Sequence, residues 1–141
     1  MPEAIQQYEA TIQVAERAGE RPILAEALRR LAVLCHLRND SARARDLCNR
    51  SYHVASVAKS DLLAAEALNT MGGLALRTGS MDEARKYLGR ALELGGQARE
   101  LLARVEQNLG ILANIQGDIP PAVAHYECSV EAHLDSNNQH G

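Results

Sequence analysis

The chain lacks several features that mark common protein classes. Its 141 residues contain neither Trp nor Phe, and the aromatic side chains are four Tyr. Hydrophobic residues still make up 46% of the sequence, mostly Ala and Leu, and this composition favours closely packed helices. No apolar run approaches the roughly 18–20 residues of a membrane span, and the N-terminus has no signal-peptide pattern. We therefore predict a soluble, cytoplasmic protein without membrane contacts.

The sequence also lacks a segment in which charges of one sign are concentrated. Its formal net charge is −3, and Lys and Arg are scattered among Asp and Glu. A nucleic-acid-binding surface gathers basic side chains against phosphates, so the pattern predicts no nucleic-acid partner. The length fits a single domain, because domains usually run to about 100–200 residues.

Cysteine is scarce and carries no binding motif. Cys35, Cys48 and Cys128 all fall in predicted helices, and no two of them form a CxxC pair. An odd number without short spacing argues against a disulfide framework or a zinc knuckle. Because Cys is among the most buried residue types, we predict reduced thiols in the core, with Cys35 and Cys48 close together.

No catalytic or metal-binding constellation stands out. Ser51, His53 and Asp61 have the residue types of a hydrolytic triad, but they lie along one helix and its end, where they cannot converge. His125 and Cys128 share a helical face, yet two adjacent ligands without a complementary pair are common by accident. The sequence predicts no enzyme, no cofactor and no metal.

What the chain does contain is an internal repeat. Four alanines recur at spacings of 40, 40 and 38 residues, each followed four residues later by a bulkier side chain; they are Ala4, Ala44, Ala84 and Ala122. A second small residue recurs in step at Ala32, Gly72 and Gly110, with spacings of 40 and 38. Two markers kept in register indicate a repeated structural unit.

Turn signals divide each unit into two helices. Asn39-Asp40, Gly79-Ser80 and Gly117-Asp118 pair a residue that accepts the left-handed conformation with one that caps the next helix. Apolar residues at helical spacing complete the pattern. The sequence predicts an all-α fold of about seven antiparallel helices, at residues 2–18, 22–37, 42–58, 62–77, 82–94, 98–115 and 120–134.

These residues carry a family resemblance. Leu109-Gly110, Gly117-Asp118, Ala122 and Tyr126 resemble the tetratricopeptide repeat (TPR), although its leading Trp and closing Pro are absent. The long period resembles the extended TPRs of bacterial signalling regulators and kinesin light chains. The resemblance implies an α-α superhelix forming one domain over residues 1–141. Residues 1–20 would be the second helix of a truncated repeat, 21–60, 61–96 and 97–136 three full repeats, and 137–141 a tail.

The resemblance also implies a binding groove. In TPR proteins the first helix of each repeat lines the concave surface, which here predicts a peptide-binding set of Arg29, His36, Asn69, Thr70, Arg77, Arg104, Gln107, Asn108 and Asn114. Asn69 and Asn108 should contact a peptide backbone, with neither facing the core. Arg29, Arg77 and Arg104 should meet acidic groups. On the second helices, Arg45, Lys86 and Arg90 should lie on the convex face.

The leading hypothesis is a protein-interaction module that holds a peptide or a partner helix in this groove. The alternative is a sensory or regulatory TPR segment of a larger bacterial signalling or transcription regulator. Because the chain opens in a second helix and ends without a polar capping helix, its stacking faces stay open. We therefore expect a segment of a longer array, or self-association through uncapped ends.

Overall fold

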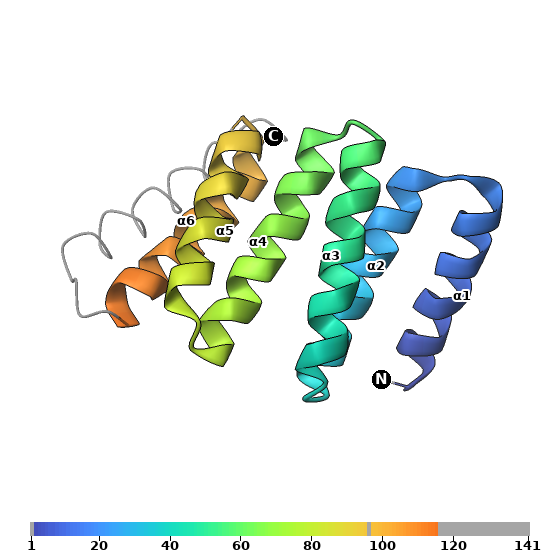
Figure 1. Ribbon diagram of the computed structural model, residues 1–141, viewed down its shortest axis with the longest axis horizontal. Coiled ribbons are helices and arrows are strands. Elements are labelled where there is room, and N and C mark those ends of the chain that lie inside the picture. Colours follow the sequence, from blue (N-terminus) through green and yellow to red (C-terminus); the bar gives the residue numbers. More distant parts are fainter. Residues whose placement is uncertain (1, 96, 116–141) are drawn as a thin grey trace, which may run out of the picture.

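The structure is a computed structural model that describes residues 2–95 and 97–115. It contains six α-helices: α1 (Pro2–Ala18), α2 (Arg21–Leu37), α3 (Ser41–Val57), α4 (Asp61–Thr78), α5 (Met81–Gly95) and α6 (Arg99–Ile115). They follow one another across Figure 1, each antiparallel to the next. The all-α prediction is confirmed, and the first six predicted helices agree with the structure to within one residue at each end. The seventh, at 120–134, lies outside the described residues.

The first four turns share one hydrogen-bonding geometry. Each turn contains one residue with positive φ, namely Gly19, Asn39, Lys59 and Gly79, with φ values of 69°, 65°, 58° and 83°. The next residue in each turn donates its backbone N–H to the carbonyl five residues back, at 2.8–3.0 Å. This bond satisfies a carbonyl that the helix end leaves unpaired. The side chains of Asp40 and Ser60 then cap the following helices.

The uniform turns explain the period of the sequence. Helices α2 to α5 begin at residues 21, 41, 61 and 81, so one helix and its turn occupy 20 residues. The connection from α5 to α6 is different, because the Ala98 N–H bonds the Gly95 carbonyl at 3.0 Å. Helix α6 begins at Arg99, two residues early. The 38-residue spacing in the sequence reflects the shorter helix α5, whose 15 residues are two fewer than the 17 of α3.

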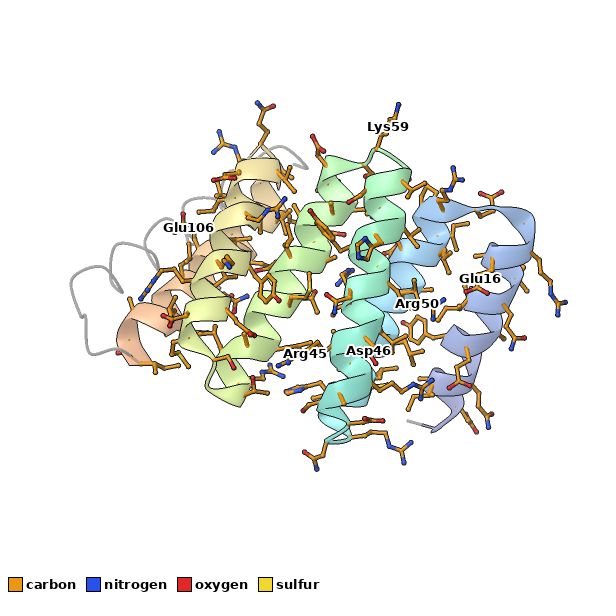
Figure 2. The ribbon with its side chains drawn as sticks, in the orientation of Figure 1. Glu16, Arg45, Asp46, Arg50, Lys59 and Glu106 are labelled. Carbon is orange, nitrogen blue, oxygen red and sulfur yellow. The ribbon has the colours of Figure 1, made fainter. Side chains whose placement is uncertain are left out.

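The helices form an inner and an outer layer. Helix α4 contacts both α2 and α6 directly, so these three first helices form a continuous inner layer. Within the outer layer, no Cα atoms of α1 and α3, or of α3 and α5, come within 8 Å. Long side chains bridge these wider gaps: Arg43 to Glu9 at 2.9 Å, Arg50 to Glu16 at 2.7 Å and Arg90 to the Tyr52 hydroxyl at 3.0 Å. Figure 2 shows Arg50 and Glu16 reaching toward each other from α3 and α1.

Small residues let the two layers approach closely. Ala32, Ala44 and Ala84, which marked the repeat in the sequence, are all fully buried. At Gly72 the approach is closer still, because a Cβ atom there would lie 2.6 Å from Cδ2 and 2.7 Å from Cγ of Leu88. Leu88 is itself fully buried on α5 and occupies the space that a side chain on α4 would need. Gly72 therefore sets the distance between α4 and α5.

The shared turn geometry predicts opposite changes in stability when glycine is introduced at Lys59 and lysine at Gly79. Lys59 adopts a left-handed conformation that disfavours any residue with a Cβ, so Lys59→Gly should raise the free energy of unfolding by on the order of 0.5–1 kcal/mol. Gly79→Lys should lower it by a similar amount, since a Cβ at Gly79 meets nothing within 4 Å and only the backbone is strained. Urea denaturation of both variants checks the pair. Two shifts of the same sign would contradict a common turn geometry.

The helix crossing predicts opposite effects at two helical glycines. Gly72→Ala should lower the free energy of unfolding by about 1–3 kcal/mol, because its methyl group overlaps buried Leu88. Gly89→Ala is the matched control on α5, where a Cβ meets nothing within 4 Å. There the substitution should stabilise by roughly 0.5–1 kcal/mol through helix propensity alone. If thermal unfolding shows both alanines to be stabilising, the crossing is not held by Gly72.

Candidate functional site

A groove crosses the inner layer and draws its walls from all three first helices. Its volume is about 250 Å³. Helix α2 contributes Val33 and His36, and α6 contributes Asn108 and Ile111. The central helix α4 supplies Asn69, Thr70, Gly73, Leu74, Leu76 and Arg77. Because α2, α4 and α6 stand side by side, residues far apart in the sequence meet on one surface.

The groove combines apolar and polar walls. Val33 and Ile111 stand on opposite helices with Gly73 between them, and Leu74 and Leu76 add further apolar surface. The polar side chains are amides, a hydroxyl, an imidazole and a guanidinium. Within the described residues, the lining contains no Asp or Glu. Such a surface offers apolar contact together with hydrogen-bond donors and acceptors, and its one permanent charge is positive.

Asn69 and Asn108 lie against each other across α4 and α6. The Asn108 Nδ2 donates to the Asn69 Oδ1 at 2.9 Å. The expectation that Asn69 faces away from the core is wrong, because only 7% of its surface is exposed. The pairing uses one donor and one acceptor. Among the described residues, the Asn69 Nδ2 and the Asn108 Oδ1 make no other bond, so the pair keeps a donor and an acceptor for a ligand.

Arg29 and Arg104 both have a partner in the protein. The Arg104 Nη2 donates to Glu66 Oε1 at 3.0 Å, and the Arg29 Nη2 lies 3.9 Å from Glu66 Oε2. Glu66 thus joins the three first helices at a point beside the groove, with its side chain 18% exposed. Neither arginine lines the groove, and one carboxylate already neutralises one of their two charges, so their binding of an acidic ligand stays a prediction.

Arg77 is the cation that lines the groove. It is exposed in the last turn of α4 and has no ion pair among the described residues. His36 of α2 lines the same groove, and its Nδ1 is buried without a hydrogen-bond partner among the described residues. On its other side His36 borders a cavity of about 20 Å³, room for roughly one water molecule. An anionic ligand group at this end of the groove would meet Arg77 without competition from a protein carboxylate.

The structure therefore brings together about half of the predicted set. His36, Asn69, Thr70, Arg77 and Asn108 line one groove. Gln107 and Asn114 are exposed on α6 but do not line it. Sequence reasoning overlooked the apolar part of the lining, Gly73, Leu74, Leu76 and Ile111, because it chose side chains by polarity. The repeat register could have predicted part of this lining, because positions 33, 73 and 111 correspond in the three repeats.

A second exposed apolar surface lies at the N-terminal end of the helix stack. Val14 on α1 is 67% exposed and Ile23 on α2 is 51% exposed. They line a hollow of about 300 Å³ together with Ala10, Thr11, Ala15, Ala18 and Glu20. Thr11 of α1 is exposed in this hollow. Ser51, which occupies the corresponding position of α3, is buried and donates a hydrogen bond to the Ala25 carbonyl of α2 at 2.6 Å. Self-association through this end stays a prediction.

The metal-binding residues considered in the sequence lie only partly within the described residues. In residues 2–95 and 97–115, no group of three or more His, Cys, Asp or Glu side chains could hold a metal ion. His125 and Cys128 lie outside this range. None of the six described helices has both the length and the apolar character needed to cross a membrane.

The two described cysteines are buried free thiols in one core cluster. Cys35 is 3% exposed and Cys48 is fully buried. Burial raises the pKa of the Cys48 thiol to about 12, an effect that the positive charge of Arg29 partly opposes. Burial also raises the pKa of Cys35. Because the thiolate is the reactive form, both positions are suited to packing and unsuited to redox or nucleophilic chemistry.

The stacked helix pairs and the groove along their inner layer define a helical-repeat protein of the interaction type. Comparison with known families agrees: the tetratricopeptide repeat model matches residues 63–135, more than half of the chain. The protein belongs to the tetratricopeptide repeat family. Its resemblance to that family in the sequence is confirmed.

A solved structure shares this fold. The crystal structure of BtubC (BKLC) from P. vanneervenii superimposes with a TM-score of 0.77 at 18% sequence identity. The match covers 94% of this chain and 56% of BtubC, so the chain spans little more than half the length of that protein. No match was found among curated proteins.

The buried thiols give a direct test of the core. In a Cys128→Ser background, Cys35 and Cys48 should react with an aromatic disulfide reagent far more slowly in the native state than in urea. The reason is that burial both raises the pKa of each thiol and blocks the approach of the reagent. Absorbance of the released thiolate measures both rates. Native labelling of Cys48 at the unfolded rate would place it outside the core.

Proposed function

We propose that the protein is an interaction module that holds a peptide segment of a partner protein in the groove of its inner layer. TPR domains are generally non-catalytic scaffolds that bind proteins or peptides. The observation that carries the proposal is that one groove gathers residues from all three first helices and leaves polar groups unpaired in it.

The polar groups suit a peptide. An extended segment offers backbone N–H groups and carbonyls that are not paired within the segment itself. The Asn69 and Asn108 amides retain one donor and one acceptor, so together they can bond both kinds of backbone group. Arg77 can bond a carboxylate side chain with two parallel N–H donors. The proposed ligand is therefore a peptide with at least one acidic residue.

The dimensions of the groove argue against a small-molecule cofactor. Pockets for such ligands usually enclose about 300–1,000 Å³ and bury most of the molecule. This groove holds about 250 Å³, just below that range, and is open to solvent. It is better suited to a linear segment that lies across the surface and places single side chains in it.

The groove assignment predicts which substitutions weaken binding. Screening the purified chain against a library of acetyl- and amide-capped peptides should yield ligands with Asp or Glu at one position. Asn108→Ala should then reduce affinity by roughly 1–3 kcal/mol, because a buried ligand group loses its partner. Arg77→Glu should act most strongly on acidic peptides, and added salt should reduce that difference, since the site is partly exposed. Fluorescence polarisation measures each affinity.

The outer layer supplies the control. Lys86 is exposed on α5, so Lys86→Glu changes the charge as much as Arg77→Glu does but lies away from the groove lining. It should leave peptide affinity unchanged. Loss of binding in Lys86→Glu, with Asn108→Ala and Arg77→Glu both tolerated, would place the ligand elsewhere.

A further inference from the structure

The three inner helices present different residues at one corresponding position. Val33 of α2, Gly73 of α4 and Ile111 of α6 follow the spacings of 40 and 38 that relate the repeats. Val33 and Ile111 carry branched apolar side chains that reach the groove, whereas Gly73 between them carries none. The middle of the groove therefore contains a depression with about the volume of one side chain.

Neither the backbone nor the core explains glycine at this position. Gly73 lies within α4 and is not among the residues with positive φ, so its conformation suits any residue. A Cβ at Gly73 would meet only the Asn108 Nδ2, at an ordinary contact distance of 3.7 Å. Gly72 beside it is the opposite case, since Leu88 fills its space. Helical glycine costs roughly 0.5–1 kcal/mol relative to alanine, so the helix itself gains nothing from Gly73.

The surroundings of the space above Gly73 define what fits there. Val33, Leu76 and Ile111 provide apolar walls, and the Asn69–Asn108 pair stands on one side. Arg77 stands one helical turn further along α4, without a carboxylate in the lining to neutralise it. The position thus offers apolar contact to one side chain, hydrogen bonds to the backbone near it, and a positive charge to a neighbouring residue.

We propose that Gly73 forms the floor of a socket for one bulky apolar side chain of an extended peptide, with an adjacent acidic residue of that peptide bound by Arg77. The proposal rests on the proposed function and specifies its ligand. An extended peptide fits better than a helix, because a helix is about 10–12 Å across and its backbone groups are already paired. Leu, Ile or Met has the size and apolar character that the socket requires.

The test is a positional-scanning library of acetyl- and amide-capped peptides, each pool fixed at one position and randomised at the others. The wild-type chain should prefer Leu, Ile or Met over Ala by about tenfold at one position, with Asp or Glu preferred beside it. Gly73→Leu fills the socket and should abolish the apolar preference while keeping the acidic one. Gly73→Ala, a smaller change, should reduce the apolar preference in part.

The controls separate the socket from the groove. Gly89→Leu adds the same side chain to α5, where a Cβ meets nothing within 4 Å, and should leave all preferences unchanged. Circular dichroism and urea denaturation should show that both leucine variants fold. If the apolar preference survives Gly73→Leu while Asn108→Ala and Arg77→Glu weaken binding, the socket proposal is wrong and the groove proposal stands. If all three variants bind as the wild type does, the proposed function fails as well.

Discussion

The arrangement of the whole molecule depends on how closely an inner helix can approach the outer helix of its repeat. Gly72 and buried alanines at the other crossings remove the side chains that would hold the two layers apart, and Leu88 occupies the space released at Gly72. Close packing of this kind tolerates little change in volume. It fixes the orientation of each inner helix, and three inner helices with the same orientation produce one continuous surface. The groove is thus a consequence of the crossings, although neither Gly72 nor the buried alanines line it.

The turns carry this local packing along the chain. Because one helix and its turn occupy 20 residues through the first four turns, corresponding positions come to the same height on successive repeats. Binding residues therefore align in rows without any contact between distant segments having to select them. The shorter helix α5 shifts α6 by two residues in the sequence, yet Asn108 still meets Asn69 and Arg104 still meets Glu66. The groove tolerates the change because α5, the shortened helix, belongs to the outer layer.

Much of this could be predicted from the sequence, and the remainder could not for a definite reason. Helices, turns and the buried cysteines follow from periodicity, capping residues and burial tendency, which are properties of single segments. The pairing of Asn69 with Asn108 and the sharing of Glu66 depend on lateral offsets between helices. Asn108 lies 39 residues after Asn69, one more than the repeat spacing of 38, and Glu66 lies 37 residues after Arg29, three fewer than the repeat spacing of 40. A residue that seems unpaired along its own helix can thus be satisfied by the next one, as Arg29 and Arg104 show.

The difference between the layers has a mechanical consequence. Neighbouring inner helices bring Cα atoms within 8 Å of one another. The outer helices do not, and are joined by Arg43–Glu9, Arg50–Glu16 and Arg90–Tyr52, contacts between long and partly exposed side chains. Exposed ion pairs are weak, and arginine side chains can lengthen or shorten their reach by changing rotamer. The solenoid should therefore bend by changing the distances between its outer helices. The distances between its inner helices should stay nearly constant. Its curvature can then adapt to the shape of a partner while the spacing of the groove residues stays constant.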